Sequence, residues 1–145
     1  MNRSALSALV KSVAWGGVAG ALPFLLVTVP LGLSWLLEGK SAIGPAAAIW
    51  AMVLPLAVAW PLTLLGFVLL GLPCTWLLAR SGHERGRFYI LAGLIAGSLP
   101  FLAAGLFPEG LGYMAFSVPG GLAGAVAGWH WGRHRDRVTA TNQQA

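Results

Sequence analysis

The sequence predicts an all-α integral membrane protein with four transmembrane helices. Hydrophobic residues make up 57% of the 145 residues and charged residues only 9%, and the mean hydropathy is +0.77. A soluble domain needs more polar surface than this composition supplies. The apolar residues are gathered in long runs separated by short polar stretches, and about 20 apolar residues suffice to cross a hydrocarbon core of about 30 Å. We therefore expect a single membrane domain over residues 1–131.

The first expected span covers about 13–37 and ends at the polar stretch Glu38-Gly39-Lys40. Ala19-Gly20-Ala21 has the small residues of a signal-peptide cleavage site. Hydrophobicity continues without a pause through Leu22–Leu37, however. We therefore expect this segment to be a retained span and not a cleaved signal.

The second apolar run, Ala42–Ala79, is too long for one upright span and contains Pro55, Pro61 and Pro73. A reversal within it would leave backbone groups unpaired in the bilayer, so we expect one crossing. Two arrangements absorb the surplus length. One long helix tilts and kinks at its prolines, or a re-entrant or interfacial segment over 44–53 precedes a span of about 54–78. The sequence favours the second, because Gly44-Pro45 is typical of a helix start.

The third expected span covers about 88–106 and stops at Pro108-Glu109-Gly110, where proline and glycine break helices. The fourth covers about 111–131. The remaining residues, 132–145, form a tail that is basic first and ends in TATNQQA. We expect these last residues to be disordered, as chain termini with polar sequences commonly are.

The positive charges predict the orientation of the chain. The formal net charge is +5, and the basic residues lie at the ends of the apolar runs. Four spans place the N-terminus, the Arg80–Arg87 loop and the tail on one side of the membrane. Under the positive-inside rule, this is a multi-pass protein of the inner (cytoplasmic) membrane with both termini in the cytoplasm. This placement also argues against nucleic acid as a partner.

The basic clusters are suited to the lipid bilayer itself. Arginine side chains at the cytoplasmic ends of spans attract anionic lipid headgroups. The residues expected to set topology and to bind such headgroups are Arg80, Arg85, Arg87, Arg133, Arg135 and Arg137.

Glycines recur at helical spacing in three of the expected spans. A small residue at every fourth position forms a groove, a glycine zipper, that lets two membrane helices approach closely. The expected packing residues are Gly16 and Gly20 in the first span, Gly93 and Gly97 in the third, and Gly120, Gly124 and Gly128 in the fourth. These rows serve either packing within the chain or self-association through the fourth span.

No pattern in the sequence indicates catalysis, a cofactor or a metal. The spans carry no ionisable side chains of the kind that mark ion or proton pathways, and Glu38, Glu84, Glu109 and Asp136 lie in separate polar segments. Cys74 is the only cysteine. The histidines are His83, His130 and His134; the last two share a helix face but have no evident third ligand. We expect a protein that is not an enzyme.

Two functions are compatible with this sequence. The first is a non-enzymatic accessory or interaction subunit with a membrane protein partner, or a small homo-oligomer. The alternative is a small transporter or channel for a neutral or apolar solute, which would use the proline-rich second segment as its pathway. A wide cavity bordered by Thr63, Thr75 and Ser98 would favour transport, and a filled interior would favour the accessory role.

Overall fold

The structure is a computed structural model that describes residues 3–38, 44–81, 86–107 and 111–143, and this part of the chain is helical and contains no strand. The all-helical prediction is confirmed. The elements are α1 (Arg3–Glu38), α2 (Gly44–Gly66), the π-helix η1 (Phe67–Gly71), α3 (Leu72–Arg80), α4 (Gly86–Ala104), α5 (Leu111–Met114) and α6 (Ser117–Gln143).

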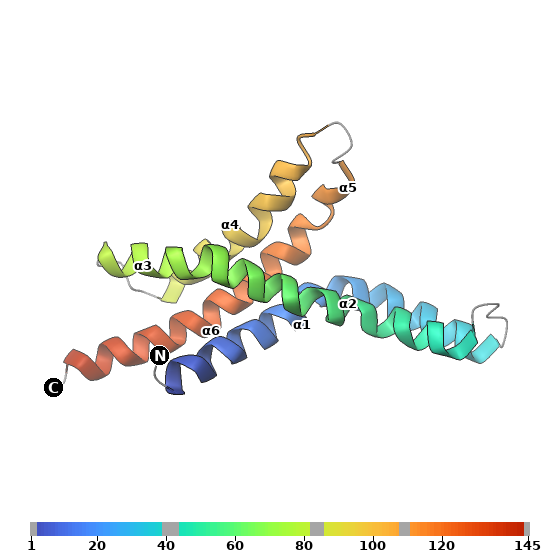
Figure 1. Ribbon diagram of the computed structural model, residues 1–145, viewed down its shortest axis with the longest axis horizontal. Helices are drawn as coiled ribbons and strands as arrows, with labels where there is room; N and C mark the ends of the chain where they lie inside the picture. The colour runs from blue at the N-terminus through green and yellow to red at the C-terminus, as the bar shows by residue number, and fades with distance from the viewer. Residues whose placement is uncertain (1–2, 39–43, 82–85, 108–110, 144–145) are drawn as a thin grey trace.

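α6 occupies the centre of the arrangement (Figure 1). It packs against α1 on one side and against α4 on the other, and α1 also packs along α2. The chain end of α6 and the start of α1 lie at the same end of the molecule (Figure 1). The second half of α1 with α2, and α4 with the first half of α6, point in different directions from the centre (Figure 1), so these two pairs form separate arms.

Three helices of the described residues are long and apolar enough to cross a membrane: α1, the continuous helix Gly44–Arg80, and α4. These helices are compatible with a membrane protein. α4 lies within two residues of the expected 88–106 at each end, whereas α1 starts well before the expected 13.

The fourth expected span, 111–131, is not a single helix. α5 ends at Met114, a turn occupies Ala115 and Phe116, and α6 begins at Ser117. α6 is not among the helices that meet the length and apolarity required for a span. The physical reason lies in its composition, because its first half is rich in glycine and its second half carries the arginines and histidines of the tail.

We expected residues 44–53 to form a segment separate from the second span, and this prediction is wrong, because these residues belong to one continuous helix. α2 runs from Gly44 to Gly66 with Pro55 and Pro61 inside it, and it continues through η1 into α3. A break would leave backbone groups without partners among apolar side chains, which costs more than the proline distortion. The structure accommodates the surplus length in another way. This helix runs obliquely to α4 (Figure 1), and an oblique helix needs more residues to cross the same thickness of membrane.

The tail is ordered further than expected. α6 extends through Gln143, so the disorder predicted for TATNQQA is wrong for 139–143, and residues 144–145 lie outside the described residues. No glycine or proline follows Gly132. Arginine, alanine and glutamine are good helix formers, so nothing in the sequence ends the helix earlier.

The buried core is small. Its largest cluster contains Phe67, Tyr89, Ala127 and Trp131, with side chains of α1 and α3 packed around it. Many large apolar side chains elsewhere are exposed, including Leu26, Trp50 and Leu69 at 60% or more. This distribution is the one expected of helices that face lipid instead of water.

Candidate functional site

The glycine row of α6 lies against α4. A β-carbon on Gly93 would overlap the carbonyl oxygen of Gly124. A β-carbon on Gly124 would in turn overlap the carbonyl oxygen of Gly93. Gly97 and Gly120 form the same reciprocal contact one turn away, and Gly128 meets the carbonyl of Tyr89. The antiparallel backbones therefore approach to a distance that only glycine permits.

The glycine pair of α1 lies against the other side of α6. A β-carbon on Gly16 would lie 2.8 Å from the carbonyl oxygen of Ala123, and one on Gly20 would lie 2.9 Å from the β-carbon of Ala123. α6 is thus covered by close helix contacts on two faces, and its glycine row is occupied by α4 within the same chain.

The long helix Gly44–Arg80 is attached to the rest of the molecule in a different way. η1 precedes Pro73, whose ring crowds the preceding turn of the helix and which has no N–H to donate. The helix widens here, so that the N–H of Leu72 donates to the carbonyl of Phe67. π-helical turns of this kind are frequent at functional sites.

A hydrogen-bonded and aromatic contact joins this widened turn to α6. The indole Nε1 of Trp131 donates to Thr75 Oγ1 at 3.1 Å, and Thr75 Oγ1 donates to the carbonyl of Gly71 at 2.8 Å. The ring of Trp131 also meets Phe67 edge-on, with centroids 5.3 Å apart. This contact closes the space between α3 and α6 at one end.

Between this closed end and the aromatic residues at the far end of α4 lies an apolar groove of about 780 Å³, which we call the interhelical groove. One wall is the long helix from Ala51 to Thr75. The other is formed by α4 from Tyr89 to Phe101 and α6 from Phe116 to Trp131, and a short stretch of α1 contributes Gly20, Phe24 and Thr28. The volume lies within the range of about 300–1,000 Å³ typical of ligand sites.

Two of the three threonine hydroxyls on the groove walls are bonded within the long helix. Thr63 Oγ1 donates to the carbonyl of Ala59 at 2.7 Å, and Thr75 bonds as described above. Thr28 Oγ1 is buried without a hydrogen-bond partner. Ser98, which we expected beside Thr63 and Thr75, does not line the groove, because its hydroxyl donates across to the carbonyl of Ser117 at 3.1 Å. The groove is therefore wide but not polar.

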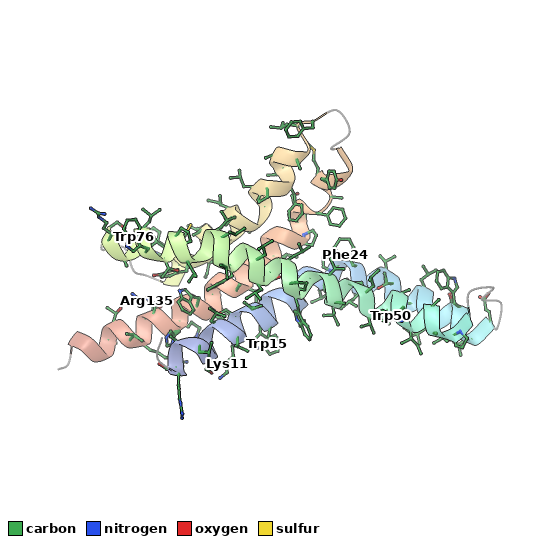
Figure 2. The ribbon with its side chains drawn as sticks, viewed as in Figure 1. Lys11, Trp15, Phe24, Trp50, Trp76 and Arg135 are labelled. Carbon is green, nitrogen blue, oxygen red and sulfur yellow. The ribbon has the colours of Figure 1, made fainter. Side chains whose placement is uncertain are left out.

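Within the described residues, the cationic side chains gather at one end of the molecule, which we call the basic end. It comprises the start of α1, the end of α3, the start of α4 and the end of α6. Figure 2 shows Lys11, Arg135 and Trp76 at this end and Trp50 at the opposite end of the long helix. Asp136 of α6 accepts a hydrogen bond from the backbone N–H of Gly86 at 3.1 Å, so the end of α6 caps the start of α4.

The arginines expected to meet lipid headgroups are placed at this end, except Arg85, which lies outside the described residues. Three of them lie over aromatic rings at 5.0–5.5 Å from the ring centroid: Arg80 over Trp76, Arg87 over Phe88 and Arg133 over Trp129. Arg137 is exposed, and Arg135 is half-buried on α6.

The histidines make aromatic contacts. The ring of His130 stacks with that of Trp15 at 6.0 Å between centroids, and its Nδ1 lies 3.1 Å from the carbonyl of Val126. His134 lies beside Trp131 with centroids 5.7 Å apart, and His83 lies outside the described residues. Within the described residues, no group of three or more His, Cys, Asp or Glu side chains could hold a metal ion.

Sequence reasoning missed the role of Trp131. Its place at the end of a span suggests an interfacial tryptophan like Trp129, yet Trp131 is only 8% exposed whereas Trp129 is 43% exposed. The spacing contains the signal, because Trp131 follows Gly128 by three residues and so shares its helix face, while Trp129 points away. The π-helix could not be predicted either, because Pro73 is the one feature of the sequence near it that indicates an irregular helix.

Comparison of this chain with protein-family models, with curated proteins and with solved structures found no match.

Proposed function

We propose that this protein is a small multi-pass protein of the cytoplasmic membrane that takes a neutral or apolar solute into the interhelical groove, as a transporter or channel for that solute. The observation that carries the proposal is the groove itself, a space of about 780 Å³ between helices with apolar walls. Its position beside the π-helix η1 supports the proposal, because π-helical turns are frequent at functional sites. Cys74 lines the groove, but no His, Asp or Glu stands among the lining residues to act as its base, and the role that we propose is not enzymatic.

The proposed orientation has the basic end in the cytoplasm. The start of α1, the end of α3, the start of α4 and the end of α6 carry the arginines and lie together, which supports the positive-inside assignment. The two tryptophans Trp50 and Trp76 are exposed at the two ends of the long helix. Their separation along the helix axis is about 39 Å at 1.5 Å per residue, and a tilted helix of this length reaches from one headgroup region to the other across a hydrocarbon core of about 30 Å.

The test of the solute role is transfer of an uncharged apolar fluorophore between the leaflets of reconstituted vesicles. We expect faster transfer with the protein than in protein-free vesicles, and slower transfer with Ala92→Phe, which narrows the groove. Leu91→Phe is the matched control, because Leu91 is 54% exposed and lies outside the groove. Equal rates with wild type, both variants and empty vesicles would contradict the proposal.

An accessory role remains the second candidate, and one observation favours it. The α1–α2 arm and the α4–α6 arm diverge (Figure 1), so the chain by itself leaves two helix pairs without neighbours at their far ends. Self-association through the glycine row of α6 receives no such support, because α4 covers that row. Co-purification from native membranes tests this candidate: a stoichiometric protein partner would support it.

A further inference from the structure

The basic end carries far more positive than negative charge. Its cationic side chains, among the described residues, are Arg3, Lys11, Arg80, Arg87, Arg133, Arg135 and Arg137. Asp136 supplies the one carboxylate of this end within the same residues, because Glu38 lies at the opposite end of α1. A partner that binds this surface should therefore be anionic.

Three of these arginines, which we call the ring-paired arginines, share one arrangement with an aromatic side chain. The guanidinium carbon lies 5.0–5.5 Å from the ring centroid in each pair: Arg80 over Trp76, Arg87 over Phe88 and Arg133 over Trp129. The pairs belong to α3, α4 and α6. In all three helices the ring comes on the side of the apolar residues and the arginine on the side of the polar segment.

This common order suits the boundary between a membrane and water. Aromatic side chains favour that boundary, and arginine extends its charged end toward the headgroups while its stem stays along apolar surface. A ring beneath the guanidinium attracts it and restricts the directions that the long side chain takes. Less rotamer freedom is then lost when the guanidinium binds a phosphate group, to which it can donate two parallel hydrogen bonds.

We propose that the basic end is a docking surface for the anionic headgroups of phospholipids, in which the paired rings are positioning residues that hold the three arginines at the depth of the lipid phosphates. This inference rests on the proposed placement of the basic end at a membrane surface, and it does not depend on the solute role.

The apolar surface beside the rings favours a lipid over a nucleic acid, which is also anionic. Leu72 precedes Trp76 by four residues on the same face of α3, and both side chains are exposed, at 41% and 60%. A phospholipid offers a phosphate to Arg80 and an acyl chain to this leucine, whereas an oligonucleotide offers only the phosphate and its bases.

The experiment measures which lipids surround the full chain. Wild type is reconstituted in phosphatidylcholine vesicles with a trace of spin-labelled phosphatidylglycerol or spin-labelled phosphatidylcholine, and electron paramagnetic resonance gives the association constant of each. We expect the anionic lipid to associate several-fold more strongly, and we expect this preference to weaken at about 1 M salt because the charges are then screened. Both leaflets contain the probe, so the result does not depend on which side is the cytoplasm.

Arginine variants test whether the ring-paired positions matter more than the total charge. Arg133→Gln should lower the preference by about two- to fivefold. Arg3→Gln is the matched control, because it removes the same charge from the same end. It should lower the preference less, since the first aromatic residue of its own helix, Trp15, comes twelve residues later.

Ring variants test the positioning role without changing the charge. Trp76→Leu should lower the preference about as much as Arg80→Gln does, and Trp76→Phe, which keeps a ring, should restore it. Trp50→Leu is the control at the opposite end of the long helix, where Trp50 is 65% exposed, and it should leave the preference unchanged. All these positions are exposed, and melting in detergent checks that each variant folds like wild type.

Three results would overturn the proposal. The first is equal association of the two lipids with wild type. The second is an equal loss of preference in Arg133→Gln and Arg3→Gln together with no loss in Trp76→Leu. The third is loss of the preference on addition of a single-stranded oligonucleotide at physiological salt, because the surface would then belong to a nucleic acid. The solute transfer assay can be run in phosphatidylcholine vesicles without anionic lipid, so the solute role and the headgroup surface can fail separately.

Discussion

Alanine substitutions at two helical glycines provide a sharp test of the packing argument. At Gly124 a β-carbon would overlap the carbonyl oxygen of Gly93 and would lie 2.7 Å from its carbonyl carbon. These are backbone atoms of α4, which cannot rotate away as a side chain could. At Gly66 the backbone is helical, with φ −60° and ψ −41°, and beyond its own turn of helix no atom lies within 4 Å of an added β-carbon.

The expected magnitudes follow from this difference. Replacing glycine by alanine inside a helix stabilises it by about 1 kcal/mol, and this gain applies at both positions. At Gly124 the helices must also move apart, at a cost of about 1–3 kcal/mol for overpacking. The free energies of unfolding of Gly66→Ala and Gly124→Ala should therefore differ by about 1–3 kcal/mol, with Gly66→Ala more stable than wild type.

The assay is thermal unfolding of both variants and wild type in the same detergent, followed by circular dichroism. A chain of this length changes its Tm by roughly 2–4 °C per kcal/mol, so the two variants should melt several degrees apart. Leu122→Ala serves as a control on α6, because Leu122 is 43% exposed. Exchanging its side-chain contacts for lipid contacts should change the free energy of unfolding little, since lipid tails are as apolar as leucine. Equal melting temperatures for the two glycine variants would refute the close-contact argument.

Three further predictions concern hydrogen bonds and orientation. Thr75→Val removes the hydroxyl that accepts the indole N–H of Trp131 and should lower the free energy of unfolding by about 1 kcal/mol. Thr28→Val removes a buried hydroxyl without a partner and should be neutral or stabilising. Thermal melting in detergent compares the two variants. Asp136→Ala removes the cap on α4 and should cost about 0.5–2 kcal/mol, seen as faster amide exchange at the start of α4; unchanged exchange there would count against the cap. In a cysteine-free background, an impermeant thiol reagent added to intact cells should label Leu106→Cys and spare Ser81→Cys; the reverse pattern would invert the proposed topology.

Helix boundaries next to polar stretches could be predicted well from the sequence. α4 follows the basic loop and ends before Pro108, and both limits are visible as changes of composition. The same reasoning failed where composition is ambiguous. Pro55 suggested a break, but a proline inside an apolar helix distorts it without ending it when no alternative partners exist for the backbone.

The groove could not be predicted, because it depends on which face each helix turns toward its neighbours. Trp131 is an example: its sequence position resembles that of Trp129, yet one side chain fills the core and the other faces outward. The hydroxyls of Thr75 and Ser98 are a second example, because both lie within apolar segments. Thr75 donates to the carbonyl of Gly71 in its own helix, whereas Ser98 donates across to the carbonyl of Ser117 in α6. Periodicity restricts such choices to a face, and tertiary packing selects among them.

The contrast between the glycines shows which of them draw helices together and which leave the groove open. The glycines of α4 and α6 are matched by close backbone contacts, which offset their cost in helix stability and draw these helices together. Gly66 lines the groove and carries the same cost, yet beyond its own turn of helix a β-carbon there would meet no atom within 4 Å. A small residue brings a packing advantage only if something approaches it. No other part of the described chain does so at Gly66, so this glycine leaves the groove open without drawing two helices together, and the comparison of Gly66→Ala with Gly124→Ala measures that difference.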